Sequence, residues 1–319
     1  MEKLIIETPS RIHLGFLELD NNSDRLFGSL GLTITNFETK LLLKKSKKIN
    51  VICDDINQKE RIKRIITLLN KKIDFPSFEM QVIKSIPSHS GLGSGTQLAL
   101  SIATLISTFA NIKISIDELA IILDRGKRSG IGIESFKNGG FIVDGGKIKD
   151  STKIPPILFN SNWPQNWKLI LILDNSLRGI HGLKEKQEFK NIKEISSELS
   201  KENCRSLCLK ILPSIIEKRF KEFCSGMQEI QNNTARIFSK AQGGLFTSKK
   251  ISMIFDFIKH KKKICYGQSS WGPTGYIILE NENKREEMFN EISIFIKNKF
   301  IKDLEMVRIE GKNNGFILK

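Results

Sequence analysis

Apolar and polar side chains alternate along several stretches of the chain, a pattern typical of half-buried β-strands. Residues 3–19 alternate in this way around Pro9-Ser10-Arg11-Ile12-His13-Leu14-Gly15, and they predict a strand, a short break and a second strand. Arg11 and His13 have the same parity, so we expect their side chains on one face of that strand. Further strands are predicted at 38–53, 78–85, 141–144, 168–174 and 306–318, the last as a closing strand or a hairpin.

Apolar residues recur at helical spacing in the segments between these strands. The spacing predicts helices at 58–71, 94–110, 116–123 and 286–299. It also predicts helical structure from residue 189 to about residue 257, broken at Pro213, Gly226 and Gly243-Gly244. Pro155, Pro156 and Pro164 mark the best candidate for a linker. Because 319 residues are enough for two ordinary domains, we expect two lobes.

Composition excludes several classes of protein. Apolar residues make up 39% of the chain, but no run approaches the length of about 18 residues that a membrane helix needs. The first residues lack the pattern of a signal peptide, so we expect a soluble, cytoplasmic protein with no membrane partner. The five cysteines are odd in number and show no CxxC spacing, which argues for buried thiols over disulfides or a zinc site.

The net charge of +16 raises the question of a nucleic-acid partner. The basic residues, however, are scattered in short runs such as Lys44-Lys45 and Lys261-Lys262-Lys263, mixed with acids and without interleaved aromatic residues. We therefore expect no specific nucleic-acid partner, although a basic nucleic-acid-binding protein stays an alternative. A positive field also suits small substrates with several negative charges.

The stretch from Pro87 to Gln97 has the local chemistry of an anion site. It follows a predicted strand and enters a predicted helix, and its glycines let the backbone approach a ligand closely. The N–H groups and positive dipole end of a helix favour phosphate. No Lys-Ser or Lys-Thr follows the glycines, so this is not a Walker A loop, and GxGxG does not fit the dinucleotide fingerprint. The residues expected to bind phosphate or pyrophosphate are Ser90, Gly91, Gly93, Ser94, Gly95, Thr96 and Gln97.

Two other glycine-rich stretches carry polar side chains. Arg125, Lys127 and Arg128 lie among glycines and offer a second anion contact, with Arg128 suited to forked pairing with a phosphate or carboxylate. The turn at 266–276 is rich in hydroxyl groups and glycine, and we expect it to line a cleft opposite the first loop.

Taken in order, three segments resemble the motifs of the GHMP small-molecule kinase superfamily: Pro9 to Phe16, the PxxxGLGSG loop from Pro87 to Thr96, and the turn from Ser269 to Thr274. The chain more closely resembles the β-ribofuranosylaminobenzene 5′-phosphate synthases of methanopterin biosynthesis, a branch of that superfamily. The segments that carry this closer match are 9–16, 93–100, 125–146 and 267–274.

The resemblance implies a two-lobed α+β fold. Residues 1–162 would form an N-lobe with a left-handed βαβ unit and residues 163–319 a ferredoxin-like C-lobe, with phosphates held by the central loop. The kinases of the superfamily carry an SGxD motif, whose aspartate lies near the phosphoryl acceptor. Here Ser129-Gly130-Ile131 is followed by Gly132, which cannot orient or deprotonate a hydroxyl group. An ATP-dependent small-molecule kinase remains the alternative enzyme, since some superfamily kinases also lack this aspartate.

The synthase resemblance implies a decarboxylating transfer of phosphoribose from phosphoribosyl pyrophosphate to 4-aminobenzoate or 4-hydroxybenzoate. Carbon dioxide and pyrophosphate would leave and a C-riboside would form, with Mg²⁺ as the cofactor. A homodimer stays open. Arg11, His13, Arg128 and Glu134 are the catalytic candidates, with His13 placed to accept a proton from, or to hydrogen-bond, the ring's para substituent. Glu134 and Asp144 are the metal candidates, and the substrate-binding candidates are Ser10, Arg125, Ser129, Arg178, Ser269, Ser270, Trp271 and Thr274.

Several of these residues have an equally good structural interpretation. Asp144 and Arg178 are also typical of surface ion pairs. Trp271 suits the core as well as a ring-stacking platform. His181 lies in a glycine loop where nothing nearby defines a proton path, so it is expected at the surface, and His89 is expected only to pack.

Overall fold

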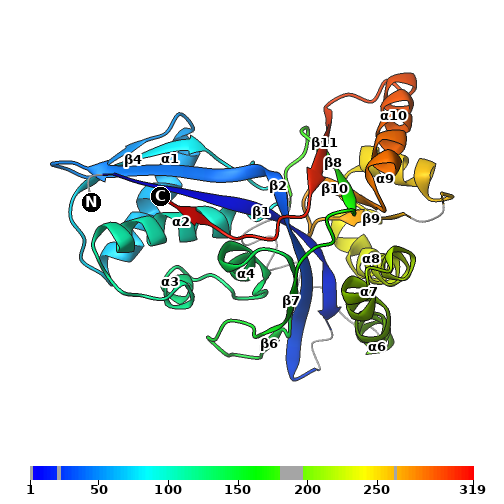
Figure 1. Ribbon diagram of the computed structural model, residues 1–319, viewed down its shortest axis with the longest axis horizontal. Helices are drawn as coiled ribbons and strands as arrows, with labels where there is room; N and C mark the ends of the chain where they lie inside the picture. Colours follow the sequence, from blue (N-terminus) through cyan, green and yellow to red (C-terminus); the bar gives the residue numbers. More distant parts are fainter. Residues whose placement is uncertain (1–2, 20–22, 180–196, 262–263) are drawn as a thin grey trace.

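Two β-sheets with flanking helices build the protein (Figure 1), and the computed structural model describes residues 3–19, 23–179, 197–261 and 264–319. The first sheet runs in the order β12-β1-β2-β4-β3, and β5, β6 and β7 extend it from β2. Its strands are β1 (Lys3–Glu18), β2 (Arg25–Lys45), β3 (Asn50–Ile52), β4 (Phe78–Lys84), β5 (Phe141–Asp144), β6 (Lys147–Ile148), β7 (Ile157–Ser161) and β12 (Ile317–Leu318).

β1 is one long strand, so the expected break inside it is wrong. It pairs with β2 along its whole length, and the register shifts twice, between Pro9 and Ser10 and between His13 and Gly15. Proline lacks the N–H group for a ladder bond, and Gly15 has a φ of 134°, which suits glycine. The two bulges therefore take up the irregular sequence and bend the strand while its pairing continues.

Four helices belong to the first lobe: α1 (Ile56–Asn70), α2 (Ser94–Phe109), α3 (Ile116–Ile122) and α4 (Ile131–Lys137). β3 and β4 are parallel, and α1 connects them, which gives the expected βαβ unit. α2 is buried along most of its length, between the sheet and its neighbouring helices. α4 begins inside the glycine-rich stretch that was expected to be an anion-binding loop.

The second sheet is antiparallel and has the strand order β11-β8-β10-β9, which is the ferredoxin-like arrangement. β8 (Lys168–Asp174), β9 (Cys265–Gln268), β10 (Thr274–Leu279) and β11 (Leu304–Glu310) form it. α9 (Lys249–Ile258) and α10 (Glu282–Asn298) cover one face, where they pack on alternate residues of β8 and β10. The other face packs against α8 (Phe220–Gln242) and joins the core of the first sheet. The expected α+β architecture is therefore confirmed.

The helical region before α9 is less interrupted than its sequence predicts. α6 (Ser197–Ser206) continues through a π-helical turn, η1 (Leu207–Ile211), into α7 (Leu212–Glu217). Pro213 does not break this run, and it lies at the start of α7 directly after the π-helical turn. Gly226 lies inside α8 and does not break it. Its place is explained by a close contact with η1, which leaves no room for a Cβ. Only Gly243-Gly244 ends a helix as expected, and residues 189–196 lie outside the described part.

Two predictions about connections also change. The expected linker contains β7, which pairs with β5. The expected closing hairpin does not form, because β11 pairs with β8 in the second sheet and β12 pairs with β1 in the first. A boundary between the two lobes at 162/163 stays a prediction. The C-terminal strand β12 belongs to the first sheet, because it pairs with β1. Among the described helices, none is both long and apolar enough to cross a membrane.

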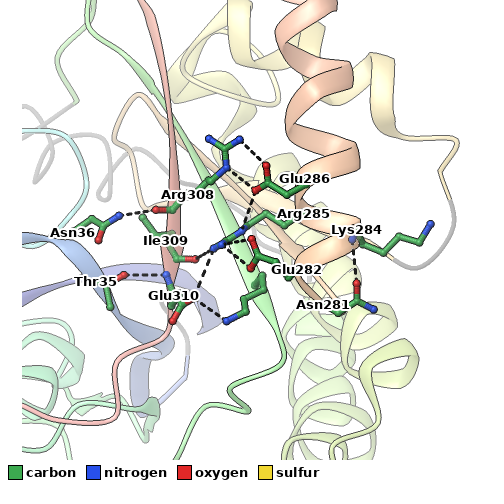
Figure 2. A network of polar contacts seen from close by, with 11 residues as sticks. Thr35, Asn36, Asn281, Glu282, Lys284, Arg285, Glu286, Arg308, Ile309 and Glu310 are labelled. Atoms are coloured by element: carbon green, nitrogen blue, oxygen red, sulfur yellow. Dashed lines mark hydrogen bonds and ion pairs between the residues drawn. The ribbon is translucent and has the colours of Figure 1, made fainter.

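A polar network joins the two sheets where β2 passes β11 (Figure 2). Asn36 donates from Nδ2 to the carbonyl oxygen of Arg308 over 2.6 Å, and the Glu310 N–H donates to Oγ1 of Thr35 over 3.0 Å. The guanidinium of Arg308 then makes two hydrogen bonds of 2.6 and 2.7 Å to Glu286 on α10. The network fixes β11 between β2 and α10, and so holds one lobe against the other.

The contact at Gly226 gives a stability prediction. A Cβ added at this glycine would lie 2.8 Å from Cγ1 of Ile211 and 3.0 Å from Cβ of Lys210. We expect Gly226→Val to lower the free energy of unfolding by about 1–3 kcal/mol through overpacking. The exposed Asn232→Ala on the same helix should change it by less than about 0.5 kcal/mol. Urea denaturation measures both, and a neutral Gly226→Val would contradict the close packing of η1 on α8.

Candidate functional site

The glycine loop ends at the N-terminus of α2, as the sequence predicts. Gly93 is the N-cap, with a φ of 81°, and no side chain caps the helix. The N–H groups of Thr96 and Gln97 turn back to the carbonyl oxygen of Gly93. Because no side chain caps the helix, its first turn leaves backbone N–H groups and the positive end of the helix dipole for a ligand.

The carbonyl oxygen of Gly91 ties the loop to both lobes. It accepts hydrogen bonds of 2.7 Å from Nη1 of Arg11 on β1 and of 2.7 Å from Oγ of Ser269, at the turn between β9 and β10. Ser269 also accepts the His13 N–H over 3.0 Å. A Cβ on Gly91 would lie 2.4 Å from the Ser269 carbonyl oxygen, and one on Gly272 would lie 2.4 Å from that of Ser90. The loop and the turn thus pack backbone against backbone, which requires glycine at both positions.

A cleft of about 450 Å³ opens beside this contact. It brings together the glycine loop, the start of α2 and the turn at 270–272. Three arginines lie there: Arg11 of β1, Arg61 of α1, and Arg125, which precedes Gly126. None of the described residues that line it is a carboxylate. They are Arg11, Arg61, His89, Gly91, Gly93, Ser94, Gly95, Thr96, Arg125, Gly179, Ser270, Trp271 and Gly272.

Two arginines face the first turn of α2. A Cβ on Gly95 would lie 2.5 Å from Nη2 of Arg61 and 3.8 Å from Nη1 of Arg125, so both guanidinium groups lie close to this glycine. Burial lowers the pKa of both groups, and for Arg125 the charge of Arg61 acts in the same direction. Both remain cationic at neutral pH, because arginine ionises far above it. Together with Arg11 they make the cleft strongly attractive to anions.

Arg61 was missed in the sequence. It lies on α1 one turn before the buried Ile65, at the edge of the helix's apolar face. That position was a weak signal, because an arginine at such an edge more often only covers apolar surface with its stem.

His13 is buried beside the cleft and does not line it. Its side chain lies against Phe16, with 4.3 Å between ring centroids, and only 4% of the residue is exposed. Burial, followed by the charge of Arg11, lowers its pKa from 6.5 to about 3. Nδ1 accepts the Gly15 N–H over 3.3 Å, so the proton of the neutral ring is on Nε2, which has no partner among the described residues. His13 is therefore a hydrogen-bond donor and a weak base.

Aromatic rings connect His13 with the cleft. The ring of Phe16 lies 5.9 Å from that of Phe238, and Phe238 meets Trp271 edge to face at 4.8 Å. Trp271 is only 2% exposed and contributes to the cleft wall. A buried cluster of aromatic side chains thus lies next to the anion site.

The two metal candidates lie away from the cleft and are already occupied by hydrogen-bond donors. Asp144 is fully buried and accepts from Ser129 Oγ and from the N–H groups of Gly130 and Gly146, over 2.8 to 2.9 Å. Burial raises its pKa, while these hydrogen bonds act the other way.

Glu134, the other metal candidate, accepts from the side-chain amides of Asn138 and Asn160 over 2.7 and 2.9 Å. It thereby ties α4 to β7. Within the described ranges, no three His, Cys, Asp or Glu residues gather as a metal site would require. Because the carboxylate oxygens of Glu134 and Asp144 already accept these hydrogen bonds, the two residues do not fit as direct metal ligands.

The remaining candidates divide by position. Ser94, Gly95, Thr96, Arg125, Ser270 and Trp271 line the cleft with Arg11, Gly91 and Gly93. Ser90 donates to the Pro87 carbonyl oxygen, Gln97 to that of Gly132, and Ser269 to that of Gly91. Described residues outside the lining are Ser10 and Thr274, both fully buried, Arg128, which is half-buried, and Arg178, which is exposed. His181 lies outside the described residues, and the expectation that it is at the surface stays a prediction.

The model of the GHMP kinases N terminal domain matches residues 60–141, which include α2 and the glycine loop. Over these residues the chain is similar to the GHMP kinases. It is 29% identical to the β-ribofuranosylphenol 5′-phosphate synthase of Methanocaldococcus jannaschii, over 92% of this chain and 95% of that one. It is also 29% identical to the enzyme of the same name from Methanothermobacter thermautotrophicus, over 88% and 90%. These relatives confirm the resemblance to the synthase branch.

Solved GHMP structures share the fold. The phosphomevalonate kinase of Streptococcus pneumoniae superimposes with a TM-score of 0.68, over 98% of this chain and all of that one, at 9% identity. The mevalonate kinase of Methanococcus jannaschii gives 0.67 over 97% and 98%, at 16% identity. At such identities the likeness shows the fold alone, and the expected two-lobed GHMP fold is confirmed.

The burial of His13 predicts a pH dependence of stability. Between pH 6.5 and about 3 the unfolded chain binds a proton at this histidine that the folded protein does not. Stability is therefore complete above pH 6.5 and falls on acidification, by up to about 1.4 kcal/mol per pH unit from this group. The non-ionising His13→Gln should remove that share. Urea denaturation from pH 7.5 to 4.5 measures it, and parallel profiles for wild type and variant would refute the assignment.

Proposed function

We propose that the protein is a decarboxylating phosphoribosyl transferase that joins the phosphoribose of phosphoribosyl pyrophosphate to a 4-substituted benzoate. The observation that carries the proposal is a cleft with three arginines, an uncapped helix start and no carboxylate among its described lining, beside a buried aromatic wall. The synthase relatives support it, since their name describes a ribosylated phenol 5′-phosphate as product. The proposal includes the place in methanopterin biosynthesis that the resemblance implies.

In the proposed reaction a new C–C bond replaces the C–CO₂ bond of the ring carbon and the C–O bond of the ribose C1. The ring carbon that bears the carboxylate attacks C1 of the ribose, and the C1–O bond breaks as pyrophosphate leaves with its electron pair. The C–CO₂ bond then breaks, its electron pair restores the aromatic ring, and carbon dioxide leaves. Since the substrate enters as a carboxylate, the reaction needs no net proton transfer.

The residues of the cleft suit the two demands of this reaction. Negative charge develops on the departing pyrophosphate, and donors that are already in place stabilise it without reorganisation. The N–H groups at the start of α2 and the guanidinium of Arg11 supply such donors next to Gly91 and Gly93. The ring must also be held against C1, and the part of the cleft at Trp271 is the apolar part proposed to hold it.

His13 is buried behind the cleft lining, so the hydrogen bond that we propose from its Nε2 to the para substituent requires the substrate to open the wall between them. A phenol or phenolate oxygen accepts such a bond readily, whereas an aromatic amine nitrogen, whose lone pair is shared with the ring, accepts it poorly. This favours 4-hydroxybenzoate over 4-aminobenzoate. The lowered pKa of His13 argues against the alternative role as a proton acceptor.

Position 132 argues against the alternative of a kinase. A Cβ on Gly132 would lie 3.3 to 3.5 Å from the side chain of Thr96, at the edge of the glycine loop. An aspartate here would be next to the phosphate site, where a kinase could use it to orient an acceptor hydroxyl. The chain has no side chain at this point, and the cleft has no carboxylate among its described lining residues.

Mg²⁺ is proposed to enter as a counter-ion of the pyrophosphate, since Glu134 and Asp144 do not fit as its ligands. No step above depends on it.

The activity is tested with 4-hydroxybenzoate that is labelled in its carboxyl group. With phosphoribosyl pyrophosphate and Mg²⁺ the protein should release labelled carbon dioxide and an equal amount of pyrophosphate, and a C-riboside phosphate should appear by mass spectrometry. ATP in place of the donor should release nothing. Failure to release label from either benzoate between pH 5 and 9, or ATP-dependent phosphorylation of a metabolite, would count against the proposal.

A further inference from the structure

We propose that Arg61 and Arg125 together bind the second, distal phosphate of the pyrophosphate leaving group. They would thereby select a ribosyl donor with a pyrophosphate at C1 over one with a single phosphate. The inference rests on the proposed function and names the group on the donor that this part of the site recognises.

The first observation is the placement of the cations along α2. The side chain of Arg11 flanks Gly93, because a Cβ there would lie 3.2 Å from its Cζ. Arg61 and Arg125 flank Gly95, two residues and about 3 Å further along the helix axis. The cleft thus has cations at two successive points of one helical turn, an arrangement that suits two linked phosphates better than one.

The second observation is that neither guanidinium forms an ion pair with a described carboxylate, although the charge of Asp124 acts on Arg125 from a distance. Those arginines that the described structure does show in ion pairs, Arg219, Arg285 and Arg308, each pair with a glutamate. Arg61 and Arg125 make no ion pair with any described carboxylate, although both are half-buried, and Nε of Arg125 is buried without a hydrogen-bond partner. Two neighbouring cations that are withdrawn from water repel each other and leave donors unused. A phosphate between them would relieve both costs.

The third observation is the space at Gly95. Any side chain at residue 95 would collide with Arg61, since even a Cβ would lie 2.5 Å from its Nη2. The absence of a side chain lets the guanidinium lie against the backbone at the start of α2, where its donors and the helix N–H groups can share one ligand. Arg61 therefore contributes to the same anion site as the glycine loop, although it comes from α1.

Calorimetric titration with pyrophosphate and with inorganic phosphate tests the proposal without any turnover. We expect Arg61→Gln and Arg125→Gln each to weaken pyrophosphate binding about 10- to 100-fold, the range for lost charge-assisted hydrogen bonds. Inorganic phosphate, which the Arg11 side of the turn can hold, should weaken far less. Arg64→Gln is the matched control, because Arg64 is an exposed arginine on the same helix, and it should bind both anions like the wild type.

A thermal melt gives a second readout. Removing one of two unpaired cations should leave the ligand-free protein at least as stable, while the stabilisation by pyrophosphate should shrink. If Arg61→Gln does not fold, Arg61→Lys serves in its place: it keeps the charge but loses the fork, and should still discriminate less between pyrophosphate and phosphate.

Failure of this inference is distinguishable from failure of the proposed function. Wild-type affinity for pyrophosphate in both glutamine variants, or an equal loss for phosphate and pyrophosphate, would overturn the inference even if labelled carbon dioxide is released. A selective loss of pyrophosphate binding supports the inference, and it does so even if no benzoate is decarboxylated, in which case the proposed reaction alone falls.

Discussion

The carbonyl oxygen of Gly91 is the point on which the site depends, because it accepts from Arg11 of one sheet and Ser269 of the other. The glycine loop could not be held by its own sequence, since its backbone turns away from regular structure between β4 and α2. The two donors fix it, and the backbone contact with Gly272 leaves no room for a side chain at either position. The anion site is therefore a property of the assembled lobes, and the network of Asn36 and Arg308 serves it from a distance by holding those lobes together.

The charged side chains are divided between the interior of the fold and the cleft. Asp144 and Glu134, the two carboxylates expected to bind a metal, lie away from the cleft and accept hydrogen bonds within the fold, so they hold loops and helices in place. Arg61 and Arg125 at the cleft have the opposite situation, since neither forms an ion pair with a described carboxylate, and Nε of Arg125 is buried without a hydrogen-bond partner. Because the lining has cations but no described acid, its field selects anions, and the helix dipole of α2 adds to it. The cost of unpaired cations in the free protein becomes affinity when an anion binds.

Local chemistry made the loop and most elements predictable from sequence. Glycine spacing before an apolar helix requires only neighbouring residues, so the site at Gly91 to Thr96 and the start of α2 could be predicted. Long-range packing was not visible. Gly226 looks like a helix breaker until η1 is seen against it, and β7 looks like a linker until it pairs with β5. For the same reason the sequence could not separate the free Arg61 from a surface arginine, nor the occupied Glu134 from a metal ligand.

The state of His13 links this architecture to the chemistry that we propose. Phe16 and the guanidinium of Arg11 keep its ring neutral, and the bulge at Gly15 fixes the tautomer by occupying Nδ1. A base would serve a kinase, which must remove a proton from its acceptor. A transfer in which carbon dioxide leaves with no net proton change has no such need, and a neutral donor can instead orient the ring by a hydrogen bond to its oxygen. The bulge at Gly15, which first appears as an irregularity of the strand, thus leaves His13 as a neutral donor, a state that suits the proposed reaction better than that of a kinase.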